Sequence, residues 1–315
     1  MYKVYTLSIN YGDFINSIKL LDQEDTNFEK EYSINNDINW FYYKYIEETT
    51  YGEYLENRGI DINDLKDSMS ENIKKVDPSI TEELILKIVS ATFERKIRKT
   101  YDLNIFYTNN KAYFITHSTI AITKFSEITN IVLTRIEVDD FPDLLLWITK
   151  KGYYNEMINN LKIVDITNLS TIEDRGNIKD SHSSDGYNLM ESDSVLYRLT
   201  RSQQITILEI YINISTVDLA FKFSLYSDYP DNSKTFNVIV NLIRMWLPDD
   251  INGYIKSIDN KTIITQFKRS YLIFIVASLF LNEAVGLYNN EKNQWKTDKK
   301  KYLRDIKDKV KKILK

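Results

Sequence analysis

The sequence contains no cysteine, only two histidines, eight glycines and four prolines. The lack of cysteine excludes disulfide bonds, thiol nucleophiles and zinc sites built from cysteine. The two histidines, His117 and His182, are too few for a metal site that needs several imidazoles. Glycine is scarce, and neither the dinucleotide-binding nor the P-loop glycine motif occurs in the chain. We therefore expect no cofactor.

Long apolar runs are also rare, and the longest is YLIFIVASLFL, from Tyr271 to Leu281. A membrane-spanning helix needs about 20 mostly apolar residues, roughly twice this length. Charged residues lie close to both ends of the run, Arg269 before it and Glu283 after it. Apolar residues on either side continue at steps of three and four, which indicates a helix over 262–288. We expect this helix to be buried in protein and predict no integral membrane insertion.

The amino terminus does not have the pattern of a secretory signal. Residues 1–10 alternate between polar and apolar instead of placing a basic stretch before an apolar one. A cytoplasmic location is the expectation that follows.

Aromatic residues, by contrast, are plentiful, at 13% of a chain of 315 residues, with 23 tyrosines among them. This supply is ample for one large core or two smaller ones. We divide the chain into a mixed N-terminal region over 1–155, a region of β-hairpins and helices over 156–290, and a basic tail over 291–315.

Hydrophobic periodicity predicts an α+β fold that is rich in helix and contains antiparallel β-hairpins. A buried apolar helix lies in its C-terminal half, and a basic amphipathic helix ends the chain. One tight hairpin is expected at Asn109-Asn110, because asparagine tolerates the positive φ of such turns. Helices are expected over 14–21, 61–75, 81–99, 141–148, 236–247 and 262–288. Strands are expected over 2–9, 103–107, 112–115, 119–125, 131–138, 161–166, 204–215 and 219–226.

A long polar segment, 170–194, interrupts this pattern and predicts a loop. Within it, Arg175 and His182 have a spacing similar to the R-x(4–6)-H motif of HEPN ribonucleases. The resemblance implies that the arginine binds phosphate and the histidine assists attack by a 2′-hydroxyl. Gly176 and Asn177 do not favour the helix on which that motif lies, so we expect a loop with a surface histidine.

Four carboxylates cluster around the start of the helix expected at 141–148, namely Glu137, Asp139, Asp140 and Asp143. Clustered carboxylates can bind Mg²⁺ or act as general acid and base. Acidic residues also gather at helix N-termini because the helix dipole favours them there. The Glu-x-Lys that a PD-(D/E)xK nuclease needs does not follow on any expected strand, so these four are only candidate metal ligands.

The charge of the chain is uneven. Residues 291–315 carry 11 basic and 4 acidic side chains, a net charge of +7, whereas residues 1–290 carry −11. Apolar residues in this tail recur at helical spacing and lysines fill the opposite face, which predicts a basic amphipathic helix. Such a helix either docks on its own protein or binds an anionic partner. The candidate binding residues are Lys299, Lys300, Lys301, Arg304, Lys307, Lys311 and Lys312.

Two functions remain open after these exclusions. The first is a non-enzymatic interaction subunit of a cytoplasmic assembly, which binds itself or another protein chain and contacts DNA or RNA backbone through the basic tail. The second is a nuclease or toxin component, metal-dependent or of HEPN type, that uses the polar segment 170–194. The chain is rich in Ile, Asn, Lys and Tyr but has six alanines, a composition that suggests an AT-rich genome such as a mobile element or bacterial immunity locus.

Overall fold

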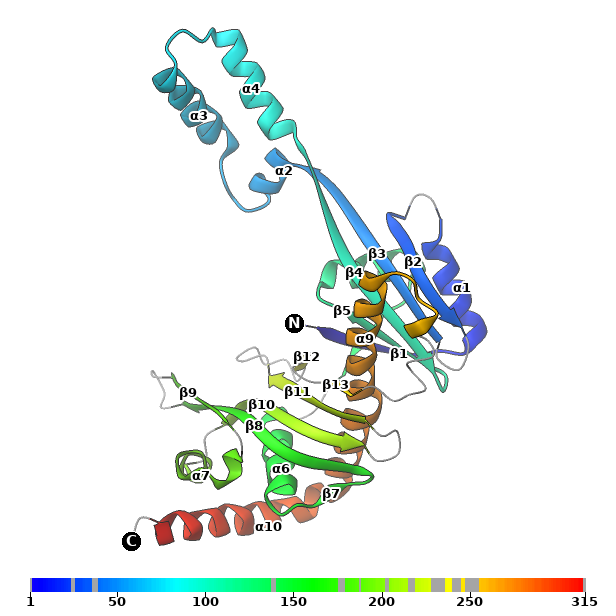
Figure 1. The fold of residues 1–315 in the computed structure, drawn as a ribbon, viewed down its shortest axis with the longest axis vertical. Helices are drawn as coiled ribbons and strands as arrows, with labels where there is room; N and C mark the ends of the chain where they lie inside the picture. The colour runs from blue at the N-terminus through cyan, green and yellow to red at the C-terminus, as the bar shows by residue number, and fades with distance from the viewer. Residues whose placement is uncertain are drawn as a thin grey trace.

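A computed structural model of the chain contains two antiparallel β-sheets joined by a long helix (Figure 1). It describes residues 2–23, 26–35, 39–136, 140–174, 179–186, 188–201, 204–214, 219–227, 236–239, 245–246 and 255–313. The predicted α+β class is confirmed, with antiparallel hairpins and a long apolar helix in the C-terminal half.

The first sheet has the strand order β2-β3-β4-β5-β1-β6. Its strands are β1 (Lys3–Ser8), β2 (Phe28–Asn35), β3 (Asn39–Thr50), β4 (Lys96–Thr108), β5 (Lys111–Thr116) and β6 (Thr134–Arg135). The helices α1 (Tyr11–Leu21) and α5 (Thr119–Thr129) pack on one face through Phe14, Ile18 and Phe125. The helix α9 (Lys261–Ile275) covers the other face, where Phe267 and Phe274 contact Trp40 and Phe106.

Strands β3 and β4 extend beyond their neighbours as a two-stranded ribbon and carry a helical arm (Figure 1). The arm consists of α2 (Tyr51–Glu56), α3 (Ile62–Val76) and α4 (Glu82–Glu94). Asp61 and Thr81 cap α3 and α4 by accepting hydrogen bonds from backbone N–H groups in the first turns. Helix α4 ends at Glu94 rather than at residue 99, because the residues from Lys96 onward pair with β3.

The second sheet has the order β12-β11-β10-β8-β7, and β9 and β13 pair with β8 and β11. Its elements are β7 (Met157–Ile158), β8 (Leu161–Asp174), β9 (Lys179–Asp185), β10 (Gln204–Ile214), β11 (Leu219–Ser227), β12 (Phe236–Ile239) and β13 (Met245–Trp246). The helix α6 (Phe141–Tyr153) packs against β8 and β10, and the 3-10 helix η1 (Leu189–Glu191) and α7 (Asp193–Thr200) lie beside them.

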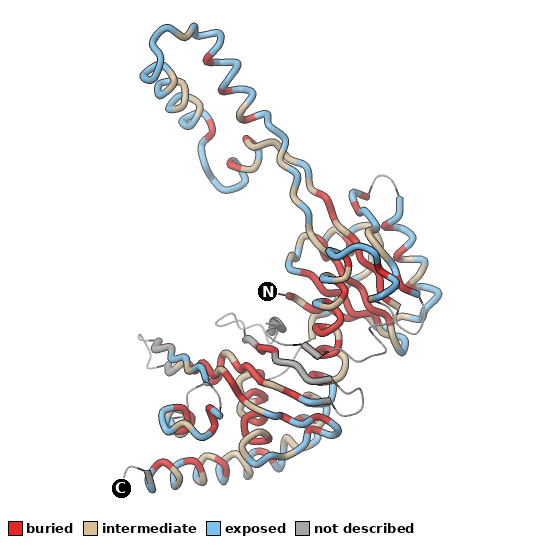
Figure 2. Tube along the Cα trace, viewed as in Figure 1, coloured by how far each residue is buried: buried red, intermediate tan, exposed pale blue. Residues whose placement is uncertain are grey.

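The long apolar helix is continuous from Lys261 to at least Lys312. It runs from α9 through a π-helical segment, η3 (Val276–Leu281), into α10 (Asn282–Ile313). The predicted burial of the apolar run is confirmed, since Leu272, Ile275 and Phe280 are almost completely buried. This core continues from the first sheet to the second, and most of the chain's buried residues lie along it (Figure 2).

Several expected elements are wrong. Residues 119–125 form helix α5 and not a strand, because Ser118 caps the segment and Ala121, Ile122 and Phe125 pack as a helical stripe. The helix expected over 236–247 is replaced by strands β12 and β13, which pair with β11. Of the strand expected over 131–138, the structure describes residues 131–136, and among these Thr134 and Arg135 form a strand.

The loop expected over 170–194 is also wrong. Strand β8 continues to Asp174, β9 returns along it, and η1 and α7 follow. Thr171 pairs with His182 in this ladder. The hairpin is at the edge of the sheet, so backbone hydrogen bonds hold it together and apolar side chains are not required.

Candidate functional site: the solvent face of helix α10

Helix α10 is fixed to the protein by one side. Trp295, Tyr302, Ile306 and Val310 are at most 6% exposed and belong to the main core. They recur at intervals of seven, four and four residues, which places them on one face of a helix. The predicted amphipathic helix is therefore present, and its apolar stripe packs against the protein's own α6 and α7.

A set of polar contacts fixes α10 to α6. Asp143 accepts hydrogen bonds from the Tyr288 hydroxyl at 2.8 Å and the Trp295 indole at 2.7 Å, and its other oxygen lies 2.5 Å from Lys299 Nζ. Glu291 accepts a hydrogen bond from the Trp147 indole at 3.0 Å. In these contacts, polar side chains at the interface between α6 and α10 form hydrogen bonds with one another.

A second group of contacts continues along the same interface. Lys151, which is 5% exposed, lies 3.2 Å from Glu291 and 3.1 Å from Glu156. Burial raises the pKa of Glu156, but hydrogen bonds from Lys150 and Lys151 outweigh it, so the net pKa is lowered. Tyr154 donates a hydrogen bond to Asp305 at 2.7 Å, and burial followed by this bond raises the tyrosine pKa.

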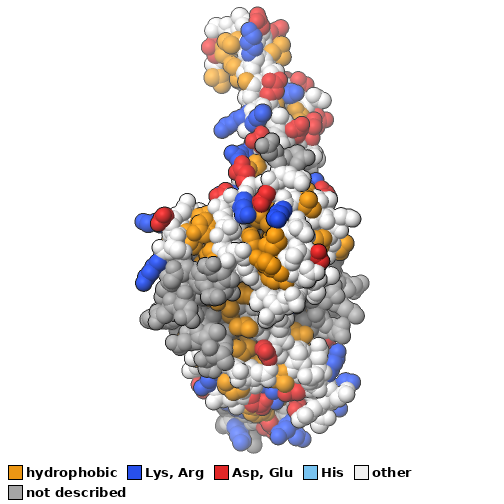
Figure 3. Space-filling view, turned by 90° about the vertical axis from the view of Figure 1, so that its right-hand side faces the viewer, with side chains coloured by type: hydrophobic (Ala, Val, Ile, Leu, Met, Phe, Trp, Pro, Cys, Tyr) orange, Lys and Arg blue, Asp and Glu red, His pale blue; other side chains and the backbone are white. Residues whose placement is uncertain are grey.

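The opposite side of α10 carries a line of cations. The residues that form it are exposed and recur at intervals of four, four, three and four residues; we name them the basic ladder: Lys296, Lys300, Arg304, Lys307 and Lys311. Fifteen residues of helix place its ends roughly 22 Å apart. Lys and Arg side chains are visible at the lower end of the molecule, where α10 lies (Figures 1 and 3).

Most of this charge is unmatched within the part of the chain that the structure describes. Lys311 lies 3.8 Å from Asp308, an exposed pair one turn apart on the helix. Among the residues that the structure describes, the other four cations of the ladder have no ion pair or hydrogen bond from their side chains. The ladder is thus a row of solvated charges held on a rigid, docked helix.

The seven basic residues predicted as a binding site do not all lie together. Lys300, Arg304, Lys307 and Lys311 lie on the ladder, and Lys301 and Lys312 are exposed beside it. Lys299 lies on the packed side, where Asp143 matches its charge. The sequence prediction omitted Lys296, although its position four residues before Lys300 could have identified it.

The predicted acidic cluster has structural roles where it can be described. Asp140 caps α6 by accepting a hydrogen bond from the backbone N–H of Asp143 at 3.1 Å. Asp143 itself serves the α6–α10 interface. Glu137 and Asp139 lie outside the described residues. Within the described part of the chain, no three His, Asp or Glu side chains come together as a metal site.

Of the predicted phosphate-binding pair Arg175 and His182, the structure describes His182. His182 is exposed on strand β9, opposite Thr171 of β8. Arg175 lies outside the described residues. The strand context differs from the helix on which a HEPN motif lies.

Comparisons with known proteins add no assignment, because no family model and no curated protein matches this chain. The helix from Lys261 to Lys312 is long and apolar enough, by length and composition, to cross a membrane. In its most apolar window, 56% of the residues are buried inside the protein.

Proposed function

We propose that the protein is a non-enzymatic interaction subunit that binds the phosphate backbone of nucleic acid through the basic ladder of α10. The single observation behind this proposal is a row of five exposed cations on the solvent side of a helix whose apolar stripe is packed in the core. Phosphates spaced along a strand attract such a row, and the bound counterions that they release drive association.

The packed stripe favours nucleic acid over an anionic membrane. A helix that lies in a membrane interface inserts its own apolar face between lipids. In α10 that face is occupied by contacts to α6 and α7, and Trp295 and Ile306 are almost completely buried. Only the charged side remains for a ligand, so recognition is electrostatic.

The composition of the ladder favours binding that is independent of base sequence. Stacking on single-stranded bases requires aromatic side chains, and direct readout of base edges requires groups placed in a groove. The ladder contains four lysines and one arginine and has no aromatic residue. Contacts to phosphate position a protein on nucleic acid but carry no sequence information.

This proposal places the protein in the cytoplasm as part of a larger assembly with its own copies or another chain. Its support is the burial of the apolar helix. The chain is rich in Ile, Asn, Lys and Tyr, a composition typical of AT-rich genomes. This composition is the reason for proposing that the protein comes from a mobile element or a bacterial immunity locus.

The test compares two triple variants that lose the same charge. Lys300→Gln, Arg304→Gln and Lys307→Gln remove the centre of the ladder. Lys19→Gln, Lys162→Gln and Lys256→Gln remove three exposed lysines elsewhere on the surface. Truncation at residue 290 is unsuitable, because removing Trp295, Tyr302 and Ile306 would uncover the core.

Binding is measured by fluorescence anisotropy on a random duplex and a random single strand between about 50 and 200 mM salt. Five phosphate contacts predict a slope of log K against log salt of about −4.5 for duplex and about −3.5 for single strand. The ladder variant should retain two contacts and a duplex slope of about −1.8. The control variant should match the wild type. Equal binding by the two variants, or none by the wild type, would contradict the proposal.

A further inference from the structure

The helical arm presents a second surface, far from α10 and independent of the basic ladder (Figure 1). Helices α3 and α4 pack on each other around a small core of their own. Ile85, Val89 and Phe93 of α4 and Ile62 of α3 form most of it. Apart from these residues, most of the arm is exposed, in contrast to the two sheets (Figure 2).

The arm exposes more apolar surface than its small core uses. Leu84 is 48% exposed, Ile88 39%, Leu65 38% and Val76 87%. Hydrophobic side chains are accordingly visible on the upper end of the molecule (Figure 3). Single exposed apolar residues need no explanation, but a set that shares one face does.

These residues do share one face. At about 100° per residue, Leu84, Ile88 and Ala91 lie together on one flank of α4, beside the buried stripe. On α3, Leu65 and Val76 lie on one flank in the same way. Because the two helices are antiparallel, both flanks are on the same side of the hairpin. The opposite side carries the Lys74–Glu82 ion pair.

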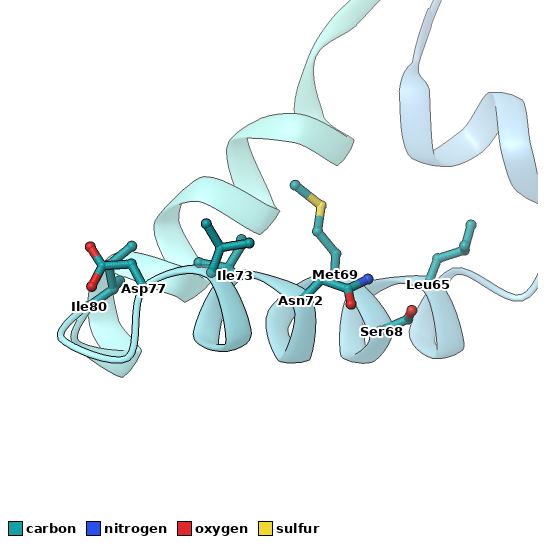
Figure 4. A pocket seen from close by; sticks show the side chains of 8 residues that line it. Leu65, Ser68, Met69, Asn72, Ile73, Asp77 and Ile80 are labelled. Atoms are coloured by element: carbon teal, nitrogen blue, oxygen red, sulfur yellow. The ribbon is translucent and has the colours of Figure 1, made fainter.

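A groove of roughly 460 Å³ runs along this face beside α3. In Figure 4, Leu65 and Met69 point to the same side of α3, and Ile73 lies one turn further on. Val76 and Ile80 close the end of the groove near the turn. The groove is lined by α3 and the turn that follows it, and Ser68, Asn72 and Asp77 supply its polar lining.

The charges at the edge of this face are complementary to those of a second copy. Glu83, Lys87 and Glu94 follow one edge of the exposed stripe of α4. Lys87 lies 2.8 Å from Glu83 of its own helix, in an exposed ion pair, so Glu94 of a second copy would be a further partner for Lys87. A two-fold axis that crosses α4 near Ser90 brings Ile88 of each copy over Ala91 of the other and Lys87 beside Glu94. Parallel pairing would instead bring lysine to lysine and glutamate to glutamate, which is unfavourable.

We infer that the arm is a self-association surface, on which the apolar faces of two copies pack as an antiparallel four-helix bundle. A two-fold interface uses the same patch on both subunits, and this patch meets that requirement in apolar surface and charge. Two helices about 20 Å long and about 10 Å apart present a face of roughly 400 Å². The total of roughly 800 Å² is in the range of weak interfaces, so the dimer is reversible.

The experiment measures the oligomeric state of the full chain by sedimentation equilibrium over a wide range of protein concentration. Ile88→Asp places a charge in the centre of the face and should weaken dimerisation by more than about tenfold. Leu86→Asp is the matched control, because Leu86 is 63% exposed on the other flank of α4. It should dimerise like the wild type, and circular dichroism checks that both variants fold.

A charge exchange tests the orientation. Lys87→Glu and Glu94→Lys should each weaken the dimer, and the double variant should restore it, because each copy then again faces the opposite charge. A wild type that is monomeric at every concentration would overturn the inference, as would equal loss in the Ile88→Asp and Leu86→Asp variants. Neither result bears on nucleic-acid binding by α10, so the two proposals can fail separately.

Discussion

Asparagine, and not the scarce glycine, occupies most of the positions where the backbone has a positive φ. In the described part of the chain, every residue other than glycine with positive φ is an asparagine. Asn109 and Asn110 form the β4–β5 turn with φ of 49° and 57°, and Asn130 ends α5 in the left-handed region. Asparagine adopts this conformation more readily than other side chains do. Eight glycines therefore suffice for a chain with many turns.

Of the two predicted acidic residues that the structure describes, Asp140 and Asp143, it is Asp143 that makes the larger set of side-chain contacts. Its carboxylate is 14% exposed and accepts from two buried neutral donors and one ammonium group. Such an arrangement fixes the angle between α6 and α10 and leaves little room for a metal ion.

We predict that Asp143→Ala lowers the free energy of unfolding by about 2–6 kcal/mol. Two buried donors, on Tyr288 and Trp295, lose their acceptor, at about 1–3 kcal/mol each. The matched change Asp140→Ala removes a helix cap and should cost about 1 kcal/mol. Urea denaturation measures both. A Mg²⁺-dependent stabilisation of the wild type that Asp143→Ala abolishes would instead support the metal hypothesis.

The long helix is the element that joins the two halves. Its first part, α9, packs on the aromatic face of the first sheet, and Phe280 of the π-helical segment packs against Phe223 of the second. Gly286 of this helix faces open space, since an added Cβ would meet no atom within 4 Å. Packing along the helix thus depends on its large apolar side chains.

We predict that Leu272→Ala destabilises the protein by about 2–5 kcal/mol, because Leu272 is 0% exposed and its removal leaves a cavity. Leu287→Ala makes the same chemical change at a half-buried position of the same helix and should cost clearly less. Thermal and urea unfolding compare the two. Equal small effects, together with recovery of the protein in salt-washed membranes, would show that the helix is not a core helix.

The two proposed surfaces lie at opposite ends of an elongated molecule, with the arm at one end and α10 at the other (Figure 1). Pairing of two arms would therefore leave both basic ladders at the far ends of the dimer. Such an assembly could contact one long polyanion at two separated places or two polyanions at once. Linked sites of this kind bind more tightly than one site alone when their spacing suits the ligand.

Burial of tyrosines makes the stability of the whole molecule fall at alkaline pH. Burial, followed by hydrogen bonding to Glu47, raises the pKa of Tyr101 to about 12. Burial also raises the pKa of Tyr42, Tyr43 and Tyr302 above the ordinary value of 10.0. These groups ionise more readily in the unfolded chain, so their contribution to stability is complete below pH 10 and is lost as pH rises through the folded pKa values.

We predict that unfolding begins above pH 10 and accompanies ionisation of the buried tyrosines. Tyrosinate absorbance and circular dichroism should change together. The variant Tyr42→Phe should flatten the fall in stability above pH 10, although loss of the hydrogen bond to Asp102 weakens the protein at neutral pH. Ionisation of nearly all tyrosines near pH 10 without unfolding would contradict this account.

The sequence by itself determined the elements whose signals are local and strong. The Asn109-Asn110 hairpin, the helices α3 and α4, and the alternating strands β10 and β11 all follow from turn chemistry or periodicity. The apolar stripe of α10 and most of its exposed lysines follow in the same way. These signals depend on neighbours within a few residues, so no distant partner is needed to interpret them.

Only the tertiary structure decided the secondary structure of segments whose hydrophobic pattern fits both the helical and the strand period, or fits neither. Residues 119–125 fit both helix and strand until packing on the first sheet selects the helix, and pairing with β11 makes residues 236–239 a strand. The polar residues of β9 carry no periodic signal, because an edge strand is held by backbone bonds to β8. Likewise, Lys299 differs from Lys300 only because Asp143, 156 residues earlier, lies against one side of α10. Contacts between residues so far apart in the chain are set by the packed fold and leave no pattern in the local sequence.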